Sequence, residues 1–390
     1  MSNKILVKGK WDYLLFLATI GMVIVGIIMV YSSSYFVMGY ERKDPNALLN
    51  REIFFVVVGT FVLWVCSRMN FRKLRALVVP LNVITLGTYS LLYTSLAVER
   101  HNSVRWVELL GGRVTFMPSE LAKYVSVITV AYLLSQKKSE KNRSRNIFLG
   151  VSLTAYIVLT LRQPDLSTTL VLASTMMAVL FFGGLKTTVA LGMSGLGILG
   201  TIMVIMSSKE KMQRVEVFFD PFIDPQNKGY QIVQSLYAIA SGGLVGTGIG
   251  SGKQKMIYLP YAYNDYIFSI FAEELGFLGC VVLIVLLSAL VLRGFKVASN
   301  APDKFSTLIA AGISSQLAIQ SIMNMYVSTN MIPSTGIPFP IISYGGTSLV
   351  MTLGAIGLVL GISRWEQKTQ KAFDNVENKN YHSLERRNRA

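Results

Sequence analysis

Long apolar runs separated by short polar segments fill the chain from residue 13 to residue 362. Most of these runs approach the roughly 20 apolar residues that a helix needs to cross the hydrocarbon core of a bilayer. A soluble helix would instead show polar residues returning at every turn. The pattern therefore predicts about ten membrane-spanning helices. They are expected at Tyr13–Ser33, Ile53–Ser67, Leu74–Leu96, Leu121–Leu134, Ile147–Leu161, Thr168–Phe182, Thr187–Met206, Ile267–Leu292, Phe305–Val327 and Ile342–Ile362.

The composition agrees with an all-α, polytopic integral membrane protein. Of the 390 residues, 52% are hydrophobic and only 15% are charged, and the mean hydropathy is +0.48. Soluble domains usually carry about 25% charged residues. Here the charged residues gather between the apolar runs, which is where a membrane protein places them.

Basic residues favour one set of connections over the other. The clusters within 68–75 and 137–145 follow the second and fourth runs, and a basic tail begins at Arg364 after the tenth. Because cytoplasmic loops carry the excess of Lys and Arg, both termini are predicted to be cytoplasmic. The formal charge of +16 then reflects topology and contact with anionic membrane lipids. Nucleic-acid binding is excluded, since it would need a basic face on a soluble domain.

The longest predicted outer loop, residues 207–266, joins the seventh and eighth spans. Structureless loops of this length are uncommon and are often functional. Residues 229–240 carry apolar side chains at helical spacing, so part of the loop is expected to lie along the membrane surface. The chain is predicted to form one membrane domain, residues 1–367, followed by a polar cytoplasmic tail, residues 368–390.

Ionisable residues within the spans are candidates for function, because burying a charge in a bilayer costs at least a few kcal/mol. Glu120 and Lys123 open the fourth span. Being three residues apart, they share one helix face and are predicted to form an ion pair. The pair fits a structural link between helices as well as it fits a functional site.

Two aspartates lie where an outer connection meets a span. Asp165 follows Arg162-Gln-Pro in a tight turn, and capping of the next helix is favoured for it over contact with a substrate. Asp265 stands among aromatic residues at the start of the eighth span, where a raised pKa would let it act as a base; capping is the alternative. Glu273 falls near the same face of that span, and Glu274 falls on the opposite side.

A glycine-rich segment, residues 241–252, precedes two lysines in the long outer loop. It does not match the phosphate-binding loop of nucleotide-binding proteins, because Thr247 and Gln254 stand where that pattern needs Gly and Ser or Thr. Lys253 and Lys255 are candidates for contact with lipid head groups or a pyrophosphate. Only two histidines occur, which excludes a histidine-rich zinc site.

Short motifs follow one another along nearly the whole chain. They are Met29-Val-Tyr-Ser-Ser-Ser34, Arg105-Trp106, Pro118-Ser-Glu-Leu-Ala-Lys123, Gln163-Pro-Asp-Leu166, Gly229-Tyr-Gln-Ile-Val-Gln-Ser235, Ser241-Gly-Gly243, Asp265-Tyr-Ile-Phe268, Glu273-Glu-Leu-Gly276, Pro333-Ser-Thr-Gly-Ile-Pro338 and Ile342-Ser-Tyr-Gly-Gly346. In this order they resemble the SEDS family (shape, elongation, division and sporulation), which includes FtsW, RodA and SpoVE. The resemblance implies a peptidoglycan glycosyltransferase that polymerises lipid II on the outer face of the bacterial cytoplasmic membrane. It also implies a class B penicillin-binding protein as partner.

The resemblance assigns roles to individual residues. The family's essential aspartate corresponds to Asp265, and its tryptophan in the second outer loop corresponds to Trp106. The Glu120–Lys123 pair matches the membrane pair near that aspartate, and Arg51 resembles an arginine that lines the same cavity. The chain departs from the usual family residues at Tyr261 and Tyr263 (for glutamate and histidine), Asn264 (for threonine), Glu52 (for glutamine) and Ser167 (for glycine).

The implied reaction releases a polyprenyl pyrophosphate, so cations must meet the departing charge. The candidates are Arg105, Arg214, Lys253 and Lys255, or a divalent cation such as Mg or Mn; no tightly bound cofactor is expected.

Two other functions stay open: a lipid II transporter whose path the intramembrane charges line, and a non-enzymatic scaffold for the division or elongation machinery. Asp220-Pro, Asp224-Pro and Gly229-Tyr-Gln resemble the FtsW and SpoVE branch slightly more.

Overall fold

The computed structural model describes residues 4–100, 103–109, 114–137, 141–256, 258–260 and 262–369, and it is mainly helical. A helix lies at each of the ten predicted spans. These helices are α1 (Tyr13–Arg42), α2 (Ala47–Arg68), α3 (Leu74–Ser90), α4 (Pro118–Ser135), α5 (Arg143–Arg162), α6 (Leu166–Phe182), α7 (Thr187–Met206), α10 (Ile267–Asn300), α11 (Lys304–Ser328) and α12 (Gly346–Ser363). Within the described residues, eight of these segments are long and apolar enough to cross a membrane.

The two helices outside that set are α4 and α6. Helix α6 is apolar but only 17 residues long. Most side chains of α4 are buried against α3, α6 and α11, so this helix can carry polar residues that a lipid-facing helix could not. The polytopic all-α fold is therefore confirmed, and the count of ten spans stays a prediction.

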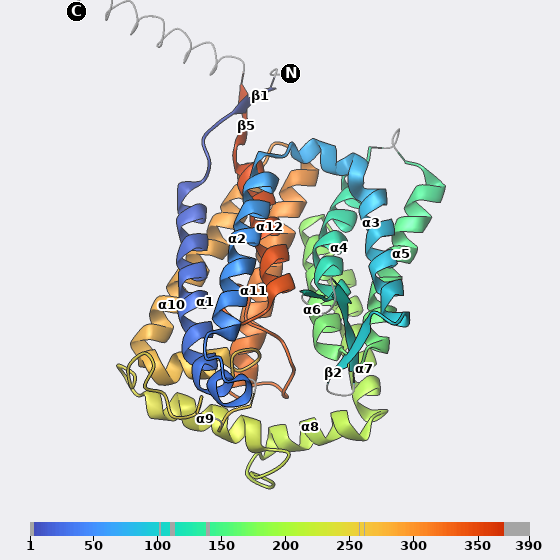
Figure 1. The fold of residues 1–390 in the computed structure, drawn as a ribbon. Coiled ribbons are helices and arrows are strands. Elements are labelled where there is room, and N and C mark those ends of the chain that lie inside the picture. Colours follow the sequence, from blue (N-terminus) through green and yellow to red (C-terminus); the bar gives the residue numbers. More distant parts are fainter. Residues whose placement is uncertain are drawn as a thin grey trace, which may run out of the picture.

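The helices form two groups that α11 joins (Figure 1). On one side α2 packs closely on α12, where Gly59 leaves room for Leu353. On the other side α3 to α7 form the second group. Helix α11 packs against α10, α4 and α6, and its Gly312 lies against Val127 and Val179. Small residues at such contacts let helices approach closely inside a membrane.

Two short helices of the long loop lie across one end of the bundle, α8 (Lys209–Phe219) and α9 (Tyr230–Gly242) (Figure 1). The predicted surface segment 229–240 thus coincides with α9. Three antiparallel strands lie between α3 and α4: β2 (Ala97–Arg100), β3 (Ser103–Leu109) and β4 (Val114–Phe116). In this sheet Val98 stands opposite Trp106.

The described ends of the chain meet at the other end of the bundle (Figure 1). Strand β1 (Lys4–Lys8) pairs antiparallel with β5 (Trp365–Thr369). Both ends therefore lie on one side, away from α8 and α9, and their cytoplasmic location stays a prediction. The predicted tail starts inside β5, at residue 368, and residues 370–390 lie outside the described residues.

Helix α10 is interrupted at Gly276, whose φ of 64° favours glycine. The glycine-rich loop supplies hydrogen-bond partners at the break: the Phe277 amide donates to the Gly243 carbonyl, and the Thr247 amide donates to the Glu273 carbonyl, both at 2.9 Å. The loop thereby satisfies backbone groups that an interruption inside a bilayer would otherwise leave unpaired.

Candidate active site around Asp265

Asp265 lies two residues before α10, at the end of the long loop between α7 and α10, and is partly buried. The side-chain amide of Asn324, on α11, donates to the Asp265 carbonyl at 2.8 Å and to the Ile337 carbonyl at 2.7 Å. Gly336 lies beside the carboxylate, since a Cβ on this glycine would be 3.2 Å from Asp265 Oδ2. The aspartate therefore stands between the start of α10 and the loop that follows α11.

That second loop also holds the residues before Asp265. The Ser343 hydroxyl donates to the Asn264 carbonyl at 2.6 Å, and the Tyr344 amide donates to the Tyr263 carbonyl at 2.9 Å. Two motifs that are far apart in the sequence, Asp265-Tyr-Ile-Phe268 and Ile342-Ser-Tyr-Gly-Gly346, are thus parts of one site.

Three charged side chains act on the Asp265 carboxyl. Burial raises the pKa of Asp265 to about 6, while the positive charges of Arg105 and Arg214 lower it and the negative charge of Asp165 raises it. A carboxylate with a pKa just below neutral is ionised at physiological pH and is a stronger base than an exposed aspartate. The electrostatics therefore suit a proton acceptor.

Arg105 is fixed to the turn between α5 and α6. Its guanidinium donates to the carbonyls of Gln163 and Pro164, at 3.2 and 2.9 Å, and lies 3.7 Å from Asp165 Oδ2. Asp165 also caps α6, accepting from the Thr168 amide at 3.0 Å, so its predicted capping role is confirmed. The turn thereby presents a positive charge toward Asp265.

Trp106 follows Arg105 in β3 and is partly buried. Because side chains alternate along a strand, Trp106 lies on the face of the sheet opposite to Arg105. Arg105 and Trp106 form one motif in the resemblance, but their side chains lie on opposite faces of this sheet.

The predicted Glu120–Lys123 ion pair is confirmed, with 2.9 Å between Lys123 Nζ and Glu120 Oε1. Lys123 also donates to Gln320 Oε1 at 2.9 Å, and the Gln320 amide donates to the Pro338 carbonyl at 2.9 Å. The intramembrane pair is therefore connected to the loop beside Asp265, although it lies on a different helix.

Arg214 and Arg51 contact different parts of the loop after α11. Arg214, on α8, lies 3.0 Å from Glu210 and 3.5 Å from the Ser334 carbonyl. Arg51, on α2, is hydrogen-bonded to Tyr344; burial raises the pKa of Tyr344 and this arginine lowers it. Tyr344 meets Tyr263 edge to face, with 6.1 Å between ring centroids.

Four of the five departures from the family pattern lie among the described residues: Glu52 and Ser167 are buried, and Tyr263 and Asn264 are partly buried. Tyr263, which stands where a histidine is usual, packs on Tyr344, the side chain to which Arg51 is hydrogen-bonded. Tyr261, in place of the usual glutamate, lies outside the described residues.

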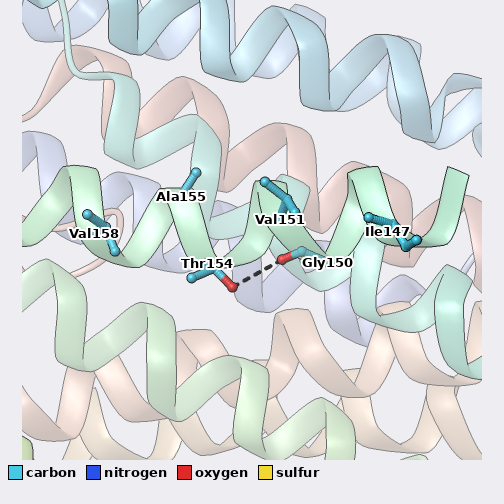
Figure 2. A pocket seen from close by; sticks show the side chains of 6 residues that line it. All are labelled: Ile147, Gly150, Val151, Thr154, Ala155 and Val158. Atoms are coloured by element: carbon cyan, nitrogen blue, oxygen red, sulfur yellow. Dashed lines mark hydrogen bonds between the residues drawn. The ribbon is translucent and has the colours of Figure 1, made fainter. Parts of the chain in front are cut away.

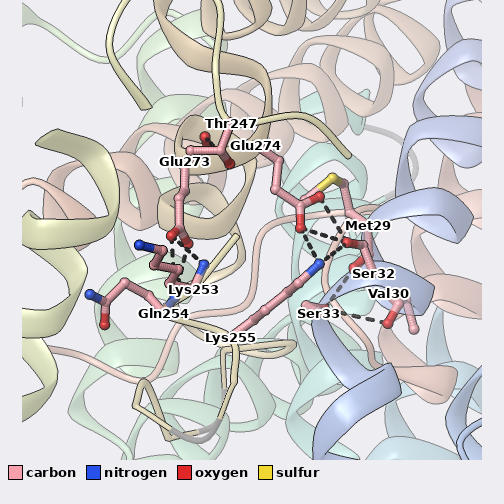
Figure 3. Close-up of polar contacts among 10 residues, drawn as sticks. All are labelled: Met29, Val30, Ser32, Ser33, Thr247, Lys253, Gln254, Lys255, Glu273 and Glu274. Atoms are coloured by element: carbon pink, nitrogen blue, oxygen red, sulfur yellow. Dashed lines mark hydrogen bonds and ion pairs between the residues drawn. The ribbon is translucent and has the colours of Figure 1, made fainter. Parts of the chain in front are cut away.

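The structure does not agree with the prediction that Lys255 contacts lipid head groups or a pyrophosphate. Its ammonium group is buried, forms an ion pair with Glu274 and donates to the Ser32 hydroxyl of α1 at 2.8 Å (Figure 3). The Ser32 hydroxyl also donates to Glu274 at 2.6 Å. With its partners inside the bundle, this lysine anchors the glycine-rich loop and offers no exposed charge to a substrate.

Glu273 is buried and likewise supports the loop. Its carboxylate accepts from the backbone amides of Lys253 and Gln254 at 2.6 and 3.2 Å (Figure 3). Glu273 and Glu274 thus hold residues 253–255 from two sides, as their predicted opposite placement on the helix allows. The Lys253 side chain is exposed and remains available for an anion.

Two residues that build the site, Gln320 and Asn324, were not among the candidates from the sequence, and Ser343 and Tyr344 were named only within the Ile342-Ser-Tyr-Gly-Gly346 motif. A signal for Gln320 and Asn324 was present, since amides four residues apart inside an apolar span need partners.

A separate hollow lies on the outer surface of α5, and no ionisable residue lines it (Figure 2). It is lined by Ile147, Gly150, Val151, Thr154, Ala155 and Val158.

Comparison with known proteins identifies relatives along nearly the full length. Residues 12–368 match the model of the FtsW/RodA/SpoVE family, described as cell cycle protein. Stage V sporulation protein E of Bacillus subtilis is 34% identical over 92% of this chain and 99% of its own length. A probable peptidoglycan glycosyltransferase FtsW of Geobacter sulfurreducens is 35% identical over 91% of this chain and 95% of its own.

Solved structures agree. The chain is similar to one in a peptidoglycan synthase complex that coordinates polymerization and crosslinking, with 28% identity, a TM-score of 0.73 and coverage of 91% of this chain and 98% of that one. It is also similar to the rod shape determining protein RodA of Thermus thermophilus, with 26% identity, a TM-score of 0.64 and coverage of 91% and 97%. The chain therefore belongs to the FtsW/RodA/SpoVE family.

Proposed function

We propose that this chain is a peptidoglycan glycosyltransferase that polymerises lipid II into glycan strands on the outer face of the bacterial cytoplasmic membrane. The observation that carries the proposal is Asp265. It is a partly buried carboxylate with a raised pKa, two residues before α10, and the positive charges of Arg105 and Arg214 act on it. The similarity to named glycosyltransferases supports the reaction class.

In the proposed reaction, an acceptor sugar hydroxyl attacks the anomeric carbon of a donor lipid. Asp265 takes the hydroxyl proton as the new C–O bond forms. The bond to the pyrophosphate breaks at the same carbon, and the polyprenyl pyrophosphate leaves with the electron pair. Direct displacement of this kind inverts the anomeric configuration.

The departing pyrophosphate gains negative charge and needs fixed cations in a partly dehydrated site. Arg105 and Arg214 act electrostatically on Asp265 from two different elements, and Lys253 is exposed at the edge of the loop. We propose that the departing pyrophosphate binds near these three cations, Arg105, Arg214 and Lys253. Lys255 has no part in this step, because Glu274 already neutralises it.

We propose that a divalent cation, if the reaction uses one, is bound mainly by the pyrophosphate of the substrate. Within the described residues, no group of three or more His, Cys, Asp or Glu side chains could hold a metal ion. Mg²⁺ is often bound by substrate phosphates with few protein ligands. Activity that disappears with a chelator and returns with Mg²⁺ or Mn²⁺ would support this part, and full activity in the chelator would remove it.

We propose a class B penicillin-binding protein as the partner, supported by the similarity to a chain of a peptidoglycan synthase complex. Bacterial membrane lipids surround the apolar helices. The two relatives that are 34% and 35% identical to this chain are named stage V sporulation protein E and FtsW, which supports a role in division or sporulation over elongation.

The test uses the full chain, purified with its candidate partner, and labelled lipid II in detergent. Wild type should form glycan strands, and Asp265→Asn and Asp265→Ala should form none, while Trp106→Ala should be impaired. Glu216→Gln, an exposed carboxylate on α8, is the matched control and should behave as wild type. Normal polymerisation by Asp265→Asn would disprove the assigned base. Transport of lipid II across vesicles without polymerisation would favour the transporter.

A further inference from the structure

One face of α11 carries three buried amides in a row, Gln316, Gln320 and Asn324. They are four residues apart, so they stand one above another along the helix. Their exposed fractions are 0%, 3% and 0%. Burying an amide without a hydrogen bond costs free energy, so the hydrogen bonds that a buried amide forms hold its partner segments in place.

Asn324 uses both amide hydrogens to join two chain segments. One goes to the Asp265 carbonyl and the other to the Ile337 carbonyl. Gly336, the neighbour of Ile337, lies against the Asp265 carboxylate. The amide therefore fixes the distance between the aspartate and the loop that forms the wall beside it.

Gln320 repeats this arrangement one helical turn away. Its amide donates to the Pro338 carbonyl, next to Ile337, and its oxygen accepts from Lys123. Lys123 in turn neutralises Glu120. The same loop is thus held by two successive amides of α11, one of which leads to the intramembrane ion pair.

We propose that Asn324 is a positioning residue for Asp265, and that Gln320 holds the same loop in place from the Glu120–Lys123 pair. Asn324 acts through the backbone of Asp265 and Ile337 and makes no contact with substrate. This inference rests on the proposed function, in which Asp265 accepts the proton. Because small displacements of a catalytic group reduce rates strongly, the effect should appear in kcat.

The test compares Asn324→Leu with Gln316→Leu. The first removes both hydrogen bonds, whereas Gln316 has no hydrogen-bond partner among the described residues. Both substitutions place a leucine of similar size on the same buried face of α11. Asn324→Leu should lower kcat by about 10- to 100-fold with KM nearly unchanged, and Gln316→Leu should stay within about twofold of wild type.

A second variant and a second readout separate positioning from folding. Asn324→Gln keeps the donors but moves them by one methylene, so kcat should lie between wild type and Asn324→Leu. The acid limb of the pH–rate profile should also move, because the charges that face the Asp265 carboxyl (Arg105 on β3, Asp165 in the α5–α6 turn and Arg214 on α8) would act from altered distances.

Two results would overturn the inference while leaving the proposed function intact. In the first, Asp265→Asn is inactive, but folded Asn324→Leu has the kcat of Gln316→Leu. In the second, Asn324→Leu loses thermal stability, and the remaining folded protein has a normal kcat and an unmoved acid limb. Inactive wild type or active Asp265→Asn would instead contradict the proposed function itself.

Discussion

The buried ion pair between Lys255 and Glu274 allows a quantitative test of what this lysine does. The side chains are 1% and 0% exposed, and the Ser32 hydroxyl is their shared partner. Lys255→Met leaves the Glu274 carboxylate with Ser32 alone, and Glu274→Leu leaves the ammonium group without a counter-charge. Removing one member of a buried pair typically costs about 3–5 kcal/mol.

Replacing both members should cost much less than the two single changes together. Two apolar side chains of similar volume leave no uncompensated charge, and such exchanges are often neutral or stabilising. We therefore expect each single variant to lose about 3–5 kcal/mol and Lys255→Met/Glu274→Leu to lie near wild type. At about 1.4 kcal/mol per tenfold, each single loss lowers the folded-to-unfolded ratio by roughly two to nearly four orders of magnitude.

The assay is a double-mutant cycle on the full chain in detergent, following unfolding by tryptophan fluorescence. The control is Glu210→Gln, which breaks the exposed pair with Arg214 and should change stability by less than about 0.5 kcal/mol. Double-variant losses equal to the sum of the single losses would refute the coupling. Polymerisation should survive in the double variant. A folded but inactive double variant would instead support a role of Lys255 in binding the pyrophosphate.

Three further predictions concern Asp265 and its neighbours. Polymerisation should decline as the pH falls through about 6, because Asp265 then takes up a proton. Arg105→Gln removes a positive charge that lowers the pKa of Asp265, so the acid limb of the pH–rate profile should move to higher pH. Gly336→Ala places a methyl group 3.2 Å from Asp265 Oδ2, so kcat should fall in steady-state assays while the unfolding midpoint stays near wild type. Asp165→Ala should lose about 1 kcal/mol of stability with the α6 cap, and Asp165→Asn, which can still cap, should lose less in thermal unfolding.

Features that depend on short stretches of chain followed from the sequence. Hydropathy located the helices, because a segment in a bilayer must satisfy its backbone hydrogen bonds internally and forms a helix. The spacing of Glu120 and Lys123 predicted their ion pair, since residues three apart meet on a helix regardless of what surrounds them. Asp165 was predicted as a cap because capping involves only the next few residues.

Contacts between distant segments were decided by the tertiary structure. Lys255 resembles any basic residue beside a glycine-rich loop, and only the packing of α1 on α10 makes it a buried partner of Glu274 and Ser32. Asn324 is 59 positions from Asp265, and nothing in the spacing of apolar residues relates them. Hydrophobic periodicity specifies which face of a helix is buried, but the side chains that meet there depend on how the helices pack.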